Sequence, residues 1–213
     1  MAMTRKRKHL FDDERAGAIY RTAARMIYEK GFDATSMNEI AEAVDLTKPG
    51  LYYYVKGKKE LLFSIMSFAM DRLDEEVIGP AREIADSQER LRWIVRQHAR
   101  LLTREAGVLG ILMDEVSGLS PEQKTRITAR KREYFDLLRS TLDDLAAEGR
   151  LRELDTTVAT FSILGMVMWL ARWFDSEGDL SGDRVAENLV EIAVAGMLRD
   201  DTAEPPMPVA AAL

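Results

Sequence analysis

Apolar residues recur at the spacing of an α-helix along almost the whole chain. In the first clear example, Ile19, Ala23, Met26 and Ile27 stand at i, i+4, i+7 and i+8, so they share one helical face. No segment shows the strict alternation of apolar and polar residues that a half-buried strand needs. The sequence therefore predicts an all-α protein of about nine helices.

Capping and breaking residues predict where these helices begin and end. Ser36 and Glu39 have the spacing of a capping box before a short helix, which we expect to end at Asp45 in a left-handed conformation. A long helix is expected to begin at Lys58 and to stop at Gly79-Pro80. Further helices are expected at about 82–104, 107–116, 121–148, 155–174 and 183–198, and the proline- and alanine-rich tail 201–213 is expected to be disordered.

The stretch TKPGLYYYV (47–55) allows two structures. Pro49-Gly50 could form a tight turn before a short strand, since aromatic and β-branched residues fit a pleated sheet. Alternatively, Thr47 caps a short helix whose first turn holds the proline. A lone strand would have no partner, whereas Leu51 and Val55 at i, i+4 can pack on the preceding helix. We therefore predict a helix, and with it a helix-turn-helix.

Composition excludes several kinds of chemistry. The chain of 213 residues has no cysteine and only two histidines, His9 and His98, which argues against disulfides, thiolate ligands and a histidine-based zinc site. Residues 80–200 contain no glycine-rich phosphate loop and no nucleophile with a credible base. The longest apolar run, FSILGMVMWLA (161–171), is too short to span a bilayer. We expect a cytoplasmic protein that is not an enzyme and needs no cofactor or metal.

Charge is distributed unevenly along the chain. Residues 1–60 carry 12 basic and 9 acidic side chains, a net charge of +3, whereas the whole chain has a net charge of −6. The remainder therefore carries −9. This asymmetry indicates a small module that attracts polyanions, attached to a body that repels them.

The predicted helix-turn-helix would present its second helix to the major groove of DNA. Lys48 at the start of that helix can donate to guanine, and Gly50 leaves the backbone bare for a close approach. Tyr52, Tyr53 and Tyr54 span too much of the helix surface for all of them to face the core. An outward-facing tyrosine can reach phosphate oxygens with its phenol hydroxyl. Lys56, Lys58 and Lys59 add positive charge. The basic stretch RKRK (5–8) either follows an adjacent groove or is a solvated terminus.

The segment AARMIYEKGFDATSMNEIAEAVDLTKPGLYYYVKGKKELL resembles the DNA-binding domain of the TetR family of transcriptional regulators in residue order and spacing. It departs from the family pattern at Asp45 (usually Gly), at Pro49-Gly50 and at Val55 (usually Phe). By resemblance, bases are contacted by Lys48 and Gly50, and Tyr52 either contacts DNA or packs inside the three-helix unit. Phosphates are contacted, by resemblance, by Thr35, Thr47, Tyr53, Tyr54 and Lys58.

The resemblance also implies the organisation of the whole chain. Residues 1–60 would form the DNA-binding domain with its basic arm, and residues 61–200 a helical domain for ligand binding and dimerisation. The last two long helices would form the interface of a homodimer. The apolar run in FSILGMVMWLA agrees with this, since a helix that is apolar on more than one face is buried on more than one side.

The segment WLARWFDSEGDLSGDRVAENLVEIAVAGM (169–197) resembles a subgroup of the same family that responds to acyl-CoA thioesters. The effector implied is an acyl-CoA or another small hydrophobic molecule. Arg172 would pair with a phosphate or carboxylate of that ligand, or else with Asp175 or Glu177 at the surface. The residues expected to line the site are Trp93, His98, Leu102, Met113, Tyr134, Trp169, Arg172 and Trp173.

The function predicted from the sequence is that of a dimeric, ligand-responsive repressor, which binds a palindromic double-stranded operator and is released by its effector. An efflux-type regulator that responds to drugs and an activator of the same fold are the nearest alternatives. A non-specific architectural DNA binder is disfavoured by the acidic body. An acyl-group carrier or enzyme is disfavoured by the missing nucleophile and base.

Overall fold

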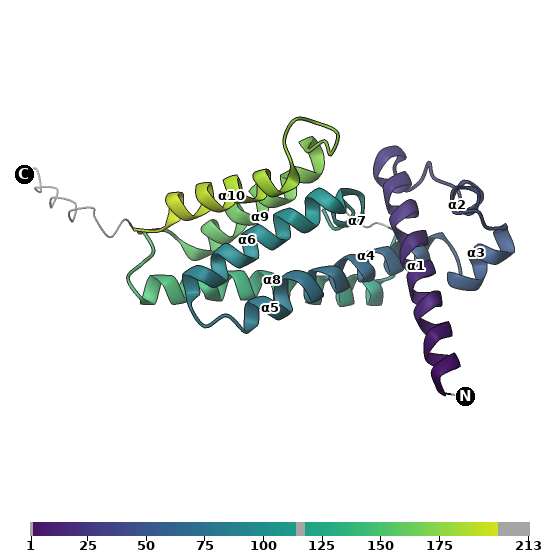
Figure 1. Ribbon diagram of the computed structural model, residues 1–213, viewed down its shortest axis with the longest axis horizontal. Coiled ribbons are helices and arrows are strands. Elements are labelled where there is room, and N and C mark those ends of the chain that lie inside the picture. The colour runs from purple at the N-terminus through teal and green to yellow at the C-terminus, as the bar shows by residue number, and fades with distance from the viewer. Residues whose placement is uncertain (1, 114–117, 200–213) are drawn as a thin grey trace, which may run out of the picture.

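The molecule is an elongated assembly of helices (Figure 1). The computed structural model describes residues 2–113 and 118–199, with side chains from residue 14 onward. Within these residues the only β-type pairing is an isolated bridge between Leu151 and Leu198. The all-α prediction is confirmed. The tail 201–213, which we expected to be disordered, lies outside the described residues.

Two short helices occupy one end of the molecule, the long body helices occupy the other, and α1 crosses between them (Figure 1). If α4, η1 and α5 are counted as one continuous rod, the described part of the chain contains nine helices. Their bounds are α1 (Ala2–Lys30), α2 (Met37–Ala43), α3 (Lys48–Tyr54), α4 (Lys58–Leu73), the π-helix η1 (Asp74–Ile78), α5 (Gly79–Arg82), α6 (Ser87–Arg104), α7 (Ala106–Gly110), α8 (Pro121–Ala147), α9 (Thr156–Trp173) and α10 (Gly182–Met197).

The prediction that Gly79-Pro80 stops the fourth helix is wrong. The backbone N–H of Gly79 donates to the carbonyl of Asp74, five residues earlier, so the helix widens into a π-turn there. The wider turn accommodates Pro80, which has no N–H to donate. A Cβ atom on Gly79 would lie 2.9 Å from the Asp74 carbonyl oxygen, so glycine also fits the turn. The helical rod continues to Arg82, and α6 begins at residue 87 rather than at about 82.

Helix α6 lies in the middle of the body, where it packs against α8, α9 and α10. Its inward face carries fully buried aliphatic side chains such as Leu91, Ile94 and Leu102. The arginines on its outer face are four residues apart. They pair with acidic residues of α10, whose residue numbers fall as those of the arginines rise. The resulting ion pairs are Arg92–Glu191, Arg96–Glu187 and Arg100–Asp183. Each such pair is exposed and contributes little to stability, but together they favour the antiparallel alignment of the two helices.

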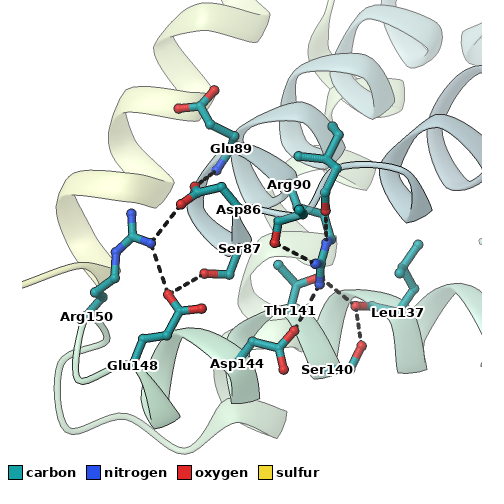
Figure 2. A network of polar contacts seen from close by, with 12 residues as sticks. Asp86, Ser87, Glu89, Arg90, Leu137, Ser140, Thr141, Asp144, Glu148 and Arg150 are labelled. Atoms are coloured by element: carbon teal, nitrogen blue, oxygen red, sulfur yellow. Dashed lines mark hydrogen bonds and ion pairs between the residues drawn. The ribbon is translucent and has the colours of Figure 1, made fainter.

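A network of polar contacts closes the end of the body that lies away from α2 and α3 (Figure 2). The buried hydroxyl of Ser87 donates to Glu148 at 2.7 Å, and Arg150 pairs with both Glu148 and Asp86. The hydrogen bond from Ser87 and then that from Arg150 hold the pKa of Glu148 below its ordinary value. The guanidinium of Arg90 similarly binds Asp144. The start of α6 is thereby fixed to the end of α8.

Asp45 ends α2 in a left-handed conformation, with φ = 54°, as the sequence predicted. An L-residue with a side chain is strained in this region, whereas glycine is not. We expect Asp45→Gly to raise the free energy of unfolding by about 0.5–1 kcal/mol, and Asp45→Val to lower it. Urea unfolding followed by circular dichroism measures both changes. Equal stability of all three proteins would contradict this explanation of the turn.

Candidate DNA-binding surface and effector site

The second helix of the helix-turn-helix, α3, is built by a capping residue and two apolar anchors. The Oγ1 atom of Thr47 accepts a hydrogen bond from the backbone N–H of Gly50 at 3.2 Å, and proline lies in the first turn. Leu51 and Val55 are buried, and α3 packs against α2. The predicted helix within residues 47–55 is therefore confirmed over 48–54, with Thr47 as its cap, and the strand is excluded. Upstream, α2 begins with the predicted capping box of Ser36 and Glu39.

The outward face of α3 exposes polar and aromatic groups. Lys48 and Pro49 are exposed at its start, and the exposed fractions of Tyr52 and Tyr53 are 42% and 75%. Tyr54 instead is half-buried against the core, with its ring edge-on to that of Tyr53 at 5.3 Å. Of the two possibilities left open for Tyr52, contact with DNA or packing inside the three-helix unit, its exposure favours the first, and the tyrosine that packs inside is Tyr54.

Two of the predicted phosphate contacts have structural partners instead. Thr35 is buried, and its hydroxyl donates to the carbonyl of Gly31 at 2.9 Å, so this hydroxyl already has a partner within the protein. The ammonium of Lys58 donates to the carbonyl of Asp33 at 3.2 Å and lies 4.4 Å from the ring centroid of Phe32. Both residues hold the loop between α1 and α2. The burial of Thr35 could have been predicted from the sequence. The capping box makes Ser36 the N-cap of α2, and this turns the preceding residue, Thr35, toward the core.

The neighbouring lysines are better placed than Lys58 to meet a phosphate backbone. Lys56 and Lys59 are both exposed beside the start of α4. The basic stretch 5–8 forms part of α1 rather than an extended arm. The side chains of that stretch lie outside the described residues.

The C-terminal half of α1 is in close contact with α7 and α9. A Cβ atom on Gly107 would lie 3.1 Å from the Cα of Arg25, and one on Gly110 would lie 2.8 Å from the ring of Tyr28. The Tyr28 hydroxyl donates to the carbonyl of Ala171 in α9 at 2.5 Å. Glycine at position 107 therefore lets the backbone of α7 lie against that of α1, and glycine at position 110 leaves room for the ring of Tyr28. This contact connects the helix-turn-helix unit to the body.

A carboxylate reinforces the same junction. Glu105, between α6 and α7, lies 3.4 Å from Arg21 of α1 and 3.4 Å from Arg72 of α4. Its side chain is only 11% exposed. One carboxylate at the α6–α7 corner therefore bridges α1 and α4.

The predicted effector residues fall into two groups. His98 and Tyr134 are 1% and 6% exposed, and the histidine Nδ1 lies 2.9 Å from the tyrosine hydroxyl. Leu102 is fully buried and Trp93 is half-buried, both on α6. Burial lowers the pKa of His98 to about 4 and raises the pKa of Tyr134, so both side chains are neutral near pH 7.

The other group lies at the surface. Trp169 and Trp173 are exposed on α9, and Met113 is exposed after α7. Arg172 has its guanidinium 5.3 Å from the ring centroid of Tyr28, so it belongs to the α1–α9 junction. The two tryptophans do not line the interior, because positions i and i+4 of α9 share its outward face. In this structure they therefore lie apart from the buried group of His98, Tyr134 and Leu102.

Two hollows lie beside the junction. One of about 680 Å³ is lined by aromatic and charged side chains of α1, α4 and α8, including Tyr20, Phe63 and Arg126. The second, of about 220 Å³, lies between α1 and the α6–α7 corner, with Arg25 and Glu105 in its wall. None of the predicted effector residues lines either hollow.

Helices α9 and α10 expose a large apolar face. Small residues interrupt it at Gly165 and Gly196, where a Cβ atom would meet nothing within 4 Å, so a partner backbone can come close. A monomeric protein rarely exposes so many large apolar groups on adjacent helices. The exposed apolar residues of this face are Val158, Phe161, Trp169, Trp173 and Ile192.

Two features are absent from residues 2–113 and 118–199. No group of histidine, aspartate and glutamate side chains there could hold a metal ion. None of the helices in the same ranges combines the length and apolarity that crossing a membrane requires.

The fold and this arrangement of α1–α3 define a helix-turn-helix regulator. Residues 19–65 match the model of bacterial regulatory proteins of the tetR family, and residues 85–197 match the tetracyclin repressor-like C-terminal domain. The chain therefore belongs to the TetR family of transcriptional regulators.

Among solved structures, the chain is similar to AibR in complex with isovaleryl coenzyme A and operator DNA. The sequences are 40% identical, the match covers 84% of this chain and 97% of that one, and the TM-score is 0.75. Over 182 residues it is 26% identical to the HTH-type transcriptional repressor KstR2 of Rhodococcus jostii, covering 82% of this chain and 87% of the relative. It is 21% identical over 194 residues to the HTH-type transcriptional activator FasR of Mycolicibacterium smegmatis, covering 91% of this chain and 87% of the relative.

The buried histidine makes stability depend on pH. The pKa of His98 is about 4 in the folded protein against 6.5 for the ordinary side chain, so the unfolded state takes up a proton first. This contribution to stability is fully present above pH 6.5 and is lost as pH falls toward 4. Between pH 7.5 and 5 we expect the free energy of unfolding to fall by about 2 kcal/mol.

Urea unfolding at several pH values measures this fall. His98→Gln should flatten the profile in that range, whereas His9→Gln, which removes the only other histidine, should leave it steep. If the free energy of unfolding of His98→Gln still fell in the same way with pH, another group would be titrating in that range.

Proposed function

We propose that this chain is a dimeric, ligand-responsive transcriptional repressor whose effector is a short acyl-CoA thioester. Residues 1–60 are assigned to DNA binding and residues 61–200 to effector binding and dimerisation. The main support for this proposal is the capped helix α3. Two buried residues fix it on α2, and its polar and aromatic face points outward. An exposed helix of this kind fits the major groove.

In this proposal, different side chains contact the bases and the sugar-phosphate backbone of the DNA. Lys48 reads a base edge, because the first residues of a recognition helix enter the groove most deeply. Tyr52 and Tyr53 bind phosphates or sugars through their exposed rings and hydroxyls. Lys56 and Lys59 supply positive charge to the backbone. Thr47 caps α3, and Gly50 allows α3 to approach the DNA closely.

Dimerisation is proposed to bury the apolar face of α9 and α10. A seven-residue helix reads too few bases for a specific site, so two copies on a palindromic operator are needed. The two tryptophans of α9, unsuited to an interior ligand site, are well suited to the centre of such an interface.

The acyl-CoA assignment is supported by the similarity to AibR, a structure of which contains isovaleryl coenzyme A and operator DNA. In this chain the apolar interior around α6 and α8 would receive the acyl group. Binding there would shift α6, and the contacts of Glu105 and Tyr28 would carry the shift to α1. The dimer would then favour a wider spacing of its two α3 helices.

Activation rather than repression is the second candidate function. FasR, an activator, matches 91% of this chain, so the fold serves both outcomes. The position of the operator relative to the promoter decides between them, and in vitro transcription from the operator selected by the protein distinguishes the two.

Operator binding that decreases with effector is the direct consequence of this proposal. Selection from random duplexes should yield a palindromic site, and saturating isovaleryl-CoA should weaken binding to it about a hundredfold, or about 2.7 kcal/mol of coupling. Fluorescence anisotropy measures the affinity, with free coenzyme A and isovalerate as controls. Release by unrelated hydrophobic drugs alone would instead support an efflux-type regulator.

Removing an exposed hydroxyl from the DNA-binding unit should weaken operator binding, whereas removing a buried one should lower stability. Tyr53→Phe removes an exposed hydroxyl, so operator affinity should fall about three- to tenfold while the melting temperature stays the same. Thr35→Val removes a buried hydroxyl that donates to Gly31, so it should lower stability by about 1–2 kcal/mol. Anisotropy and thermal unfolding of both variants test this. Loss of affinity in Thr35→Val at full stability would restore Thr35 as a DNA contact.

The apolar face gives a matched test of dimerisation. Val158→Glu with Trp169→Glu places charges on the exposed side of α9, so sedimentation should show a monomer that keeps its helical circular dichroism. Arg132→Glu, a change of charge at an exposed site on α8, should remain dimeric. A wild-type protein that sediments as a monomer at micromolar concentration would refute the proposed interface.

A further inference from the structure

The His98–Tyr134 pair is a polar site inside the apolar core of the body. His98 projects from α6 and Tyr134 from α8, and their rings meet edge-on with centroids 5.4 Å apart. The hydrogen bond of 2.9 Å uses Nδ1 of the histidine. The other ring nitrogen, Nε2, is buried and has no hydrogen-bond partner among the described residues. A buried polar atom of this kind is costly unless something binds it.

Counting protons shows that the pair always has one donor to spare. A neutral histidine carries one N–H and a neutral tyrosine one O–H, and the bond between them uses only one of the two. Phenol is the stronger acid and imidazole nitrogen the stronger acceptor, so the favoured arrangement has Tyr134 donating to Nδ1. The remaining proton is then on Nε2, which becomes a fixed donor.

A neutral carbonyl oxygen is the chemical group that this donor fits. It accepts a hydrogen bond and brings no charge into an apolar core. A carboxylate would need a cation, and the ammonium of Lys131, one turn before Tyr134 on α8, already donates to the carbonyl of Leu112. The thioester carbonyl of an acyl-CoA meets these requirements.

We propose that His98, oriented by Tyr134, recognises the effector by donating from Nε2 to the carbonyl oxygen of its thioester. This inference rests on the proposed acyl-CoA response and adds the residue that distinguishes a thioester from other apolar ligands. Tyr134 is the positioning residue, because it fixes the tautomer of the imidazole. Leu102 and the other aliphatic residues of α6 contribute apolar surface without discriminating.

The test compares two ligands that differ only in the carbonyl group. Isovaleryl-CoA carries the thioester, and S-(3-methylbutyl)-CoA carries the same branched chain on a thioether. Isothermal titration of the full-length protein should show about tenfold tighter binding of the thioester. Equal affinity of the two would overturn the role of His98 and leave the acyl-CoA response intact. If neither bound, the proposed effector class would fail together with this inference.

Two variants at position 98 then locate the donor. His98→Asn keeps an amide near Nδ1 for Tyr134 but removes the group at Nε2, so the tenfold preference should disappear. His98→Gln places an amide nitrogen near Nε2, so part of the preference should return. Tyr134→Phe leaves the imidazole unoriented, so it should reduce the preference, whereas Tyr20→Phe, at the distant α1–α4 hollow, should keep it. A preference that survives in His98→Asn would contradict the proposal.

Discussion

The close contact of α1 with α7 and α9 is the constraint on which the rest of the structure depends. Two glycines of α7 let its backbone lie against α1, and Tyr28 extends across to a carbonyl of α9. Because α1 also forms part of the helix-turn-helix unit, the orientation of α3 follows from this one junction. Glu105 adds an ion pair to each of α1 and α4. Short, direct contacts therefore connect the body to the DNA-binding end.

Positive charge and exposed apolar surface lie on different parts of the molecule, and each has its own role. The positive charge of the first 60 residues accompanies the exposed face of α3, whereas the acidic body repels DNA outside that face. The apolar face of α9 and α10 lies on the body rather than on the DNA-binding end (Figure 1). One copy can therefore bind a half-site with one end while the body remains free to meet a second copy.

Local sequence signals were enough for most of the fold, because they act within a few residues. The capping box at Ser36 and the left-handed residue Asp45 lie where the sequence placed them. Gly79-Pro80 misled the prediction because a π-turn, which widens the helix by one residue, removes the clash that normally makes proline a stop. That turn has no short sequence signature.

The candidate sites were harder to predict because burial is a property of the packed structure. Thr35 and Tyr54 resemble surface residues in the sequence, yet one binds a backbone carbonyl and the other packs on the core. Trp169 and Trp173 looked suited to a ligand site, but which face of α9 is covered depends on helices distant in the sequence. The pairing of His98 with Tyr134, 36 residues apart, likewise depends on the register of α6 against α8.

In the proposed mechanism, an effector in the body changes the spacing of the two α3 helices. The chain has no cysteine, so a single Glu42→Cys substitution allows a spin label to be attached at an exposed position of α2, which packs against α3, in each copy. Pulsed electron paramagnetic resonance then measures the distance between the two labels in the dimer. We expect a shift to longer distances with saturating isovaleryl-CoA and to shorter distances with operator DNA. Identical distance distributions with and without a bound effector would contradict it.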